Sequence, residues 1–165
     1  MRHFLILTIL IFFAGSLGMS ATPGSQEKKP AAKPDFSGSW KVNIEKSNFG
    51  PSPTPKSLQY KIEQKGPTLK LTSTRADETA EDSVVLNFTI DGQENVNNVR
   101  GSEVKSKVTW DGAVLVIDSV STSEGGTFGL KDQWTLSADG KTITWARHYS
   151  GSAGDAEASY ILEKQ

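Results

Sequence analysis

Three consecutive residues near the end of the sequence, Arg147, His148 and Tyr149, have the chemistry needed to hold an anion. A guanidinium donates paired hydrogen bonds to a carboxylate, and a phenol hydroxyl adds a further polar group. In a β-strand Arg147 and Tyr149 point to one face and His148 to the other. Asp132, in an earlier segment, either orients the arginine toward a ligand or only neutralises it in an ion pair. Both interpretations remain open at this stage.

Residues for catalysis and metal binding are scarce. Beyond residue 20 the sequence has one histidine, His148, and it has no cysteine anywhere. The segment Gly-Ser-Ala-Gly at 151–154 lacks the strand and helix that expose a nucleophilic serine. A group of acidic residues without calcium-loop spacing is typical of a solvated loop: Asp77, Glu78, Glu81 and Asp82. The sequence therefore predicts no cofactor, no metal site and no enzyme, and a barrel isomerase ranks only as a third hypothesis.

The elements that must position these residues are β-strands. From Asp35 onward, apolar and polar residues alternate with a period of two, and turn signals close nearly every segment. The pattern predicts an all-β fold, an antiparallel up-and-down meander barrel of eight to ten strands with no substantial helix. The expected strands are 37–46, 57–65, 68–75, 83–90, 100–110, 113–121, 126–136, 141–149 and 156–163, with a short one at 94–97.

Turn residues set the register of three hairpins. Asp139-Gly140 is expected to place Trp134 opposite Trp145 and Asp132 opposite Arg147, on one face of the sheet. The other two turns, at Asp111-Gly112 and Gly66-Pro67, predict the pairs Trp110 with Ala113, Val108 with Leu115, Ser106 with Ile117, Lys105 with Asp118, Ile62 with Leu71, and Tyr60 with Ser73.

These registers place all four tryptophans, at positions 40, 110, 134 and 145, on inward faces. Buried aromatic residues stabilise a domain without disulfides by about 3 to 5 kcal/mol each on truncation, so core packing alone explains them. Alternatively, they line a cavity with one inward charge. On that hypothesis the ligand-binding residues are Trp40, Tyr60, Asp132, Trp134, Trp145, Arg147 and Tyr149.

The first 34 residues differ in composition from the rest. Residues 1–20 join Arg2 and His3 to an apolar run, Phe4 to Phe13, which is typical of a signal peptide and too short to span a membrane. Cleavage is expected near Ser20/Ala21, which predicts a secreted or periplasmic protein. Residues 21–34, rich in Pro and Lys, are expected to be a flexible linker, and 35–165 the barrel domain.

The charge balance argues against a polyanionic partner. Removal of residues 1–20 leaves 17 basic and 19 acidic side chains. Proteins that bind nucleic acid or an anionic membrane need clustered Lys and Arg in excess of the acids. Nucleic acid and stable membrane insertion are therefore not expected.

The stretch Gly38-Ser39-Trp40 resembles the Gly-x-Trp motif that opens the first strand of lipocalins and their calycin relatives. The resemblance implies that the glycine turns the chain into the barrel and that Trp40 closes its floor beneath an arginine, for which Arg147 is the candidate. The stretches SKVTWDGAVLVI at 106–117 and SYILEK at 159–164 are similar to the fatty-acid-binding branch. The whole chain resembles small secreted lipocalin-like proteins of bacteria.

The sequence departs from both branches in identifiable places. Fatty-acid-binding proteins carry two helices between their first strands, whereas 47–56 is too short for them and contains three prolines. Their Arg-x-Tyr pair, which holds a carboxylate, is reproduced by Arg147 and Tyr149 one strand early. The resemblance implies only that these two residues share an anion-holding role.

Two hypotheses of different classes follow. The first is a barrel that binds a small apolar or amphipathic ligand, one bearing a carboxylate for example, in its interior. The alternative is a protein-interaction or inhibitor module with a solid core, whose loops at 47–56, 75–82 and 121–127 contact a protein partner. The volume of the interior distinguishes them, because a binding cavity needs several hundred cubic ångströms of open space.

Overall fold

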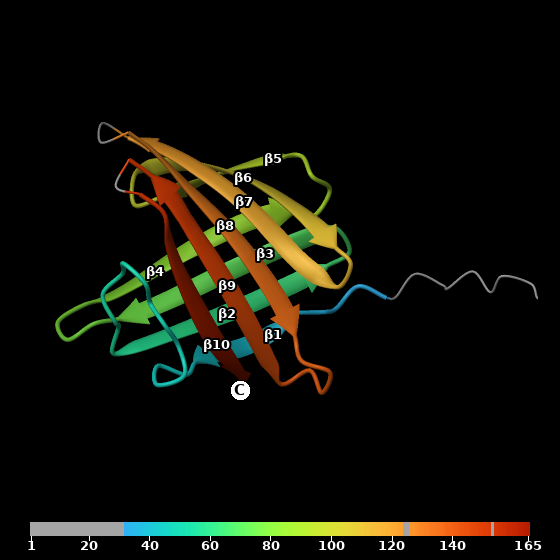
Figure 1. Cartoon of the computed structure of the whole chain (residues 1–165). Helices are drawn as coiled ribbons and strands as arrows, with labels where there is room; N and C mark the ends of the chain where they lie inside the picture. Colours follow the sequence, from blue (N-terminus) through green and yellow to red (C-terminus); the bar gives the residue numbers. More distant parts are fainter. Residues whose placement is uncertain (1–31, 124–125, 153) are drawn as a thin grey trace, which may run out of the picture. The chain divides into compact units, whose positions relative to one another are not determined.

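The computed structural model describes residues 32–123, 126–152 and 154–165, and this part of the chain folds into ten β-strands (Figure 1). The signal peptide and most of the linker predicted from the sequence lie outside the described residues. The strands are β1 (Gly38–Val42), β2 (Ser57–Lys65), β3 (Thr68–Ala76), β4 (Glu81–Thr89), β5 (Glu94–Val99), β6 (Ser102–Asp111), β7 (Val114–Ser123), β8 (Gly126–Leu136), β9 (Thr142–Gly151) and β10 (Ala156–Lys164).

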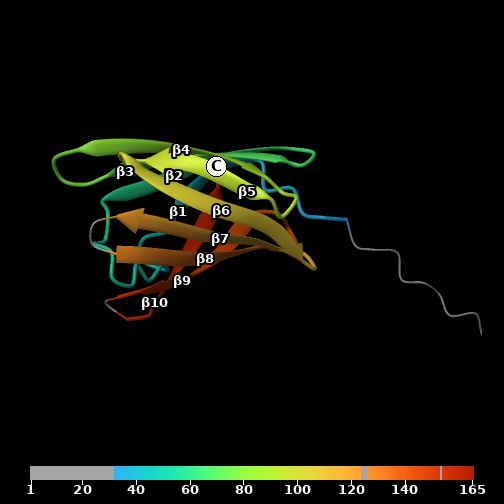
Figure 2. The same cartoon turned by 90° about the horizontal axis from the view of Figure 1, so that it is seen from above.

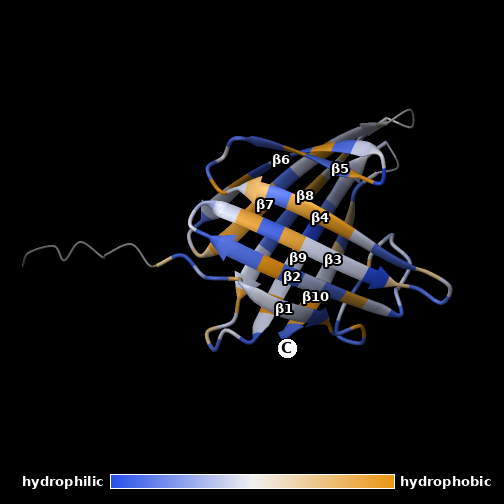
Figure 3. Cartoon of the chain, turned by 180° about the vertical axis from the view of Figure 1, so that it is seen from behind, coloured by the Kyte–Doolittle hydropathy of each residue, from blue (hydrophilic) through white to orange (hydrophobic). Residues whose placement is uncertain are grey.

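One antiparallel sheet contains all ten strands, in the order β4-β3-β2-β1-β10-β9-β8-β7-β6-β5. The sheet curls into a nearly closed barrel, with β2–β4 on one side of the interior and β8–β10 on the other (Figure 2). Apolar and polar residues alternate along most of the strands (Figure 3), and the buried core residues come mainly from the apolar positions. The all-β meander barrel predicted from the sequence is confirmed. No helix in the described ranges is long and apolar enough to cross a membrane.

Two of the three predicted hairpin registers are confirmed. Trp134 lies opposite Trp145 and Asp132 opposite Arg147 across β8 and β9. Across β2 and β3, Ile62 pairs with Leu71 and Tyr60 with Ser73. Both registers follow from turn residues that fix the connection between their strands.

The register predicted at Asp111-Gly112 is wrong by two residues. Asp111 remains in the ladder opposite Val114, so that the loop consists of Gly112 and Ala113, and Trp110 pairs with Leu115 rather than Ala113. Gly112 has φ +57°, which suits the first central position of a two-residue hairpin turn that requires a positive φ there. Likewise Val108 pairs with Ile117, Ser106 with Ser119 and Lys107, not Lys105, with Asp118. Because the error is an even number of residues, every side chain keeps its predicted face.

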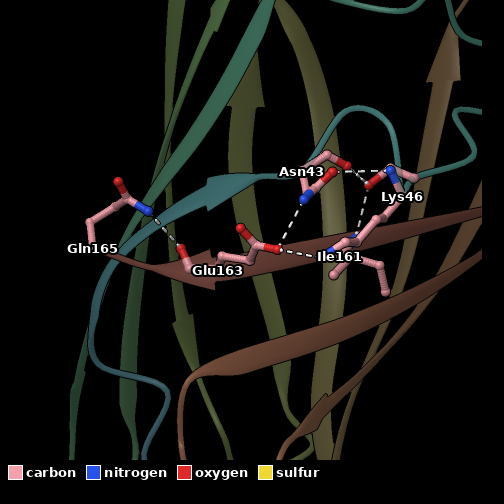
Figure 4. A network of polar contacts seen from close by, with 6 residues as sticks. Asn43, Lys46, Ile161, Glu163 and Gln165 are labelled. Atoms are coloured by element: carbon pink, nitrogen blue, oxygen red, sulfur yellow. Dashed lines mark hydrogen bonds and ion pairs between the residues drawn. The ribbon is translucent and has the colours of Figure 1, made fainter.

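Strand β1 ends at Val42, earlier than the predicted boundary at 46. The side chain of Asn43 accepts a hydrogen bond from the Lys46 N–H at 3.1 Å, and its carbonyl accepts one from the Ser47 hydroxyl at 2.6 Å. Such local bonds favour a turn over a continued strand. Asn43 also donates to Glu163 on β10, as Figure 4 shows, which ties the turn to the last strand.

The barrel is not closed by backbone hydrogen bonds between β4 and β5, which are the two ends of the sheet. Side chains of two asparagines on β5 bridge the opening instead. Asn97 accepts from the Asn87 N–H at 2.8 Å and donates to the Asn87 carbonyl at 3.0 Å. Asn95 forms the equivalent pair with Thr89, at 2.7 and 3.3 Å. A primary amide has the same donor and acceptor as a peptide group, so each asparagine replaces one rung of the missing ladder.

The floor of the barrel is built from the residues around the Gly-x-Trp stretch. Phe36 is fully buried and packs on Trp110 and Trp134, while the Trp40 indole donates to the Phe36 carbonyl at 2.9 Å. Lys33, just before it, already contacts the barrel by donating to the Gly112 carbonyl at 2.6 Å. The core therefore begins before β1.

The expectation that Arg147 covers Trp40 is wrong. The Lys164 ammonium, from β10, lies 5.2 Å from the centre of the Trp40 ring. Arg147 lies instead over Trp145, at 5.0 Å. Cations interact favourably with the face of an indole. Lys164, near the end of the strand that pairs with β1, is the residue placed to do so at the floor.

Candidate functional site

A cavity of about 510 Å³ occupies the barrel interior. Aliphatic and aromatic side chains form most of its wall, and polar ones are grouped on particular strands. The lining residues from β2–β4 are Tyr60, Leu71, Ser73, Val84, Leu86 and Phe88; those from β5–β9 and the β5–β6 turn are Val99, Arg100, Ser102, Val104, Ser106, Ile117, Ser119, Ser121, Phe128, Leu130, Asp132, Trp134, Trp145 and Arg147. This open volume contradicts a solid core packed by its own side chains.

Five of the seven predicted ligand-binding residues lie together on the cavity wall: Tyr60, Asp132, Trp134, Trp145 and Arg147. The structure places the other two elsewhere. Trp40 is part of the floor, bonded to Phe36. The Tyr149 hydroxyl lies 3.1 Å from the Tyr160 hydroxyl and 3.4 Å from that of Ser52, outside the lining. Ligand contact by any of the seven stays a prediction.

Asp132 and Arg147 form a bidentate ion pair on the cavity wall. Nε and Nη2 of Arg147 donate to the two carboxylate oxygens of Asp132, at 2.6 and 2.7 Å. Burial by itself lowers the pKa of Arg147, but the charge of Asp132 and the hydrogen bonds to it outweigh burial and raise that pKa well above the ordinary value. The guanidinium is therefore charged at ordinary pH.

Aromatic rings surround this guanidinium. Its central carbon lies 5.0 Å from the Trp145 ring centre, 5.7 Å from that of Tyr160 and 5.8 Å from that of Tyr149. The rings fix the orientation of Arg147 through cation–π contact and through packing on its aliphatic stem. Arg147 thus packs among three rings, with its charge on the wall of the cavity.

Tyr60 is a further polar residue of the cavity wall. Burial raises the pKa of Tyr60 to about 12, so its hydroxyl is a neutral donor at ordinary pH. Its ring packs on Trp145 at 5.0 Å between centres. Trp134 and Trp145 pack on each other at 4.6 Å, and their buried indole nitrogens have no hydrogen-bond acceptor among the described residues. Ring packing therefore holds the two indoles. They are part of the packed core and they also line the cavity, the two alternatives considered from the sequence.

A serine patch on β6 and β7 was not singled out from the sequence. It comprises Ser102, Ser106, Ser119 and Ser121, all lining the cavity. The hydroxyls of Ser106 and Ser119 are 2.8 Å apart across the ladder. The sequence did contain a signal for this patch. The serines occupy inward positions on faces of β6 and β7 that are otherwise apolar, and polar residues at inward positions indicate a solvated or ligand-filled interior.

A smaller compartment of about 160 Å³ adjoins the cavity. Five residues line both spaces, which therefore adjoin each other: Tyr60, Ser73, Val84, Arg100 and Arg147. Arg75 and Arg100 were also missed from the sequence, since nothing in a strand pattern distinguishes an arginine at the barrel mouth from one on the outer surface.

His148 lies away from the cavity and points outward, with Nδ1 2.6 Å from Glu157 Oε1. Two of the four acidic residues expected in a solvated loop, Glu81 and Asp82, lie instead at the start of β4. Asp77 pairs with Arg75, and Asp82, which lines the smaller compartment, pairs with Arg100. In the part of the chain that the structure describes, no three metal-ligating side chains come together.

No protein-family profile and no curated protein matches this sequence. Solved structures with a similar fold do exist. A secretory abundant heat soluble protein from Ramazzottius varieornatus has a TM-score of 0.59 at 17% identity, covering 82% of this chain and 98% of that one. Zebrafish ileal bile acid-binding protein, complexed with cholic acid, has a TM-score of 0.54 at 18% identity, covering 79% and 98%. A fatty acid transporter termed REP1-NXSQ, a Y128F mutant, scores 0.51 at 14% identity, covering 79% and 98%.

At these identities the likeness concerns the fold and not the ligand. It covers nearly the whole of each neighbour and about four fifths of this chain. The barrel fold that the resemblance implied is thus shared with solved structures, whereas the narrower likeness to bacterial lipocalin-like proteins has no matching sequence relative. The chain therefore shares the barrel fold of these solved structures.

Proposed function

We propose that this protein binds a small apolar or amphipathic molecule inside its barrel and has no catalytic role. The observation that carries the proposal is the cavity of about 510 Å³. Ligand sites usually span about 300 to 1,000 Å³, with mostly apolar walls and a few placed polar groups. The apolar residues of β2–β4 together with Asp132, Arg147 and the serine patch match that description.

Arg147 is proposed as the polar anchor of the ligand. Its pairing with Asp132 uses one N–H of Nε and one of Nη2, which leaves the remaining N–H groups of the guanidinium for a further acceptor. The uncharged Tyr60 hydroxyl, from β2, is a second donor that lines the cavity. A carboxylate-bearing amphiphile fits this arrangement, and structural neighbours named for bile acid binding, with cholic acid bound, and for fatty acid transport lend it support.

Intrinsic tryptophan fluorescence tests the proposal, because Trp134 and Trp145 line the cavity. Saturable changes are expected with long-chain carboxylates, retinoids or aromatic acids. The variant Asp132→Asn/Arg147→Gln replaces the ion pair with a neutral pair. It should lower the affinity for carboxylates at least tenfold, while neutral alcohols of equal chain length bind with unchanged affinity. No saturable change with any compound would remove the proposal, and equal loss for alcohols and acids would remove Arg147 as the anchor.

We also propose that the protein acts outside the cytoplasm, after removal of residues 1–20. The support is the pattern of a short basic start, an apolar run and small residues. Mass spectrometry of the mature protein should find an N-terminus at or next to Ala21. An intact Met1 in the mature protein would contradict the proposal.

A further inference from the structure

We propose that the smaller compartment, lined by Arg75, Arg100 and Arg147, binds a tetrahedral oxyanion, the phosphate or sulfate ester group of an amphiphile whose apolar part fills the larger cavity. The proposal rests on the ligand-binding function above and names the head group that it selects. The compartment measures about 160 Å³ and shares five lining residues with the cavity, so the two spaces adjoin. The apolar part of such an amphiphile would lie in the larger space and its head group among the arginines of the smaller one.

Hydrogen-bond donors dominate this compartment. Three guanidiniums line it, and the hydroxyl residues beside them are Ser52, Tyr60, Ser73 and Tyr160. A single carboxylate, Asp82, is in the lining. Guanidinium groups form paired hydrogen bonds with phosphate and sulfate oxygens, and they are less strongly hydrated than ammonium groups.

The three arginines come from three separate elements. Arg75 is near the end of β3, Arg100 is in the turn between β5 and β6, and Arg147 is in the middle of β9. A planar carboxylate offers two oxygens in one plane, whereas a tetrahedral ester group offers three oxygens in different directions. Donors arranged around a space rather than along one wall suit the tetrahedral group better.

The aspartates that pair with these arginines differ in how easily an anion replaces them. Asp132 is buried and bidentate with Arg147, so that pair stays intact. Asp77 and Asp82, which pair with Arg75 and Arg100, have side chains 51% and 44% exposed. Exposed pairs contribute little to stability, so an incoming oxyanion can displace these carboxylates at small cost.

The backbone of Arg100 provides an independent observation. Arg100 has φ +52° and Gly101 has φ +86°, which makes them the two central residues of a tight turn between paired Val99 and Ser102. That turn favours asparagine, aspartate or glycine at its first position, and a long side chain is unfavourable there. An arginine at a backbone conformation that is unfavourable for it is a reason to look for a function of its side chain. The Arg100 side chain lines both spaces.

Displacement of the uncharged dye Nile red by C12 amphiphiles tests the inference. The compounds are dodecyl phosphate, dodecyl sulfate, dodecanoate and dodecanol. Wild-type protein is expected to bind the phosphate and the sulfate at least tenfold tighter than dodecanoate. Arg75→Gln/Arg100→Asn should abolish that preference while dodecanol binds as before. Lys70→Gln/Lys105→Gln removes the same charge from exposed residues outside both linings and should preserve it.

The outcomes separate this inference from the proposed function. Equal wild-type affinities for ester and carboxylate, or a preference that survives Arg75→Gln/Arg100→Asn, would overturn the oxyanion site and leave the cavity function in place. Failure of Nile red and of every amphiphile to bind would overturn both. The single variant Arg100→Asn should weaken dodecyl phosphate without lowering Tm. A lower Tm with unchanged phosphate affinity would mean that Arg100 is only structural.

Discussion

Arg147 and Asp132 face each other directly across β8 and β9, and two hydrogen bonds of 2.6 and 2.7 Å join the guanidinium to both carboxylate oxygens. The pair lies on the cavity wall, with the Asp132 side chain only 6% exposed. Apolar replacements often stabilise a protein as well as a buried ion pair does, so stability alone gives little reason to keep a charge here. A role of Arg147 in ligand binding would explain why the charge is kept.

Removing one partner of this pair should be costly. Asp132→Asn leaves a buried arginine without its counter-charge and is expected to lower the free energy of unfolding by about 3 kcal/mol or more. Urea denaturation measures the loss. Glu94→Gln, which breaks the exposed pair with Lys105, should cost less than about 1 kcal/mol. The apolar double variant Asp132→Leu/Arg147→Met should recover most of the stability, and equal small losses for both single variants would contradict this account.

Asn97 should stabilise the open seam of the barrel. Asn97→Ala removes both hydrogen bonds to the Asn87 backbone, and we expect a loss of about 1 to 3 kcal/mol because partly buried peptide groups are left unpaired. Hydrogen exchange of the Asn87 amide should become faster. Asn87→Ala is the matched control, since it alters only an exposed side chain and keeps the same backbone partner. Unchanged exchange in Asn97→Ala would show that the seam is held by other contacts.

The raised pKa of Tyr60 should make the free energy of unfolding fall at alkaline pH. Its pKa is raised from 10.0 to about 12 by burial, so between those values the unfolded state releases its proton while the folded state keeps it. Stability is therefore complete below pH 10 and falls as pH rises toward 12, by about 3 kcal/mol at most for this residue. Denaturant unfolding at pH 9 and pH 11.5 measures the fall. Tyr60→Phe keeps the ring and should show a smaller fall, and identical falls would refute the assignment.

Gly38 is required by its backbone conformation. It has φ +141°, and an added Cβ would lie 2.9 Å from Cε of Lys164. Gly38→Ala should lower stability by about 1 to 3 kcal/mol, mainly through backbone strain. Gly151→Ala is the control, because Gly151 is also in a strand but has an ordinary φ and room for a Cβ at 3.5 Å. Thermal unfolding that ranks the two variants equally would contradict the explanation of the Gly-x-Trp stretch.

The fold was predictable wherever a local signal fixed a non-local pairing. Asp139-Gly140 determined which residue faces Arg147, and the alternation then determined which side chains point inward. Asp111-Gly112 was misassigned because a dipeptide alone does not say whether the aspartate belongs to the turn or to the strand. Packing partners were harder to predict, since the choice of Lys164 over Arg147 beside Trp40 depends on how the first and last strands meet.

The interior volume could not be obtained from the sequence. It depends on barrel curvature and on the seam held by Asn95 and Asn97, and the alternation contains no information on either. The same limit applies to Arg75 and Arg100, whose place at the second compartment follows from where a strand end and a turn converge.

Filling the cavity tests the central claim most directly. Val84 and Val85 are neighbours on β4, but Val84 lines the cavity whereas Val85 is 44% exposed on the outside. Nile red binding should be lost, with Kd raised at least tenfold, in Val84→Trp/Leu86→Trp, while Val85→Trp binds like the wild type. Folding of both variants is checked by circular dichroism. Equal affinity of the two variants and the wild type would mean that the ligand does not bind inside the barrel, and the account would be wrong.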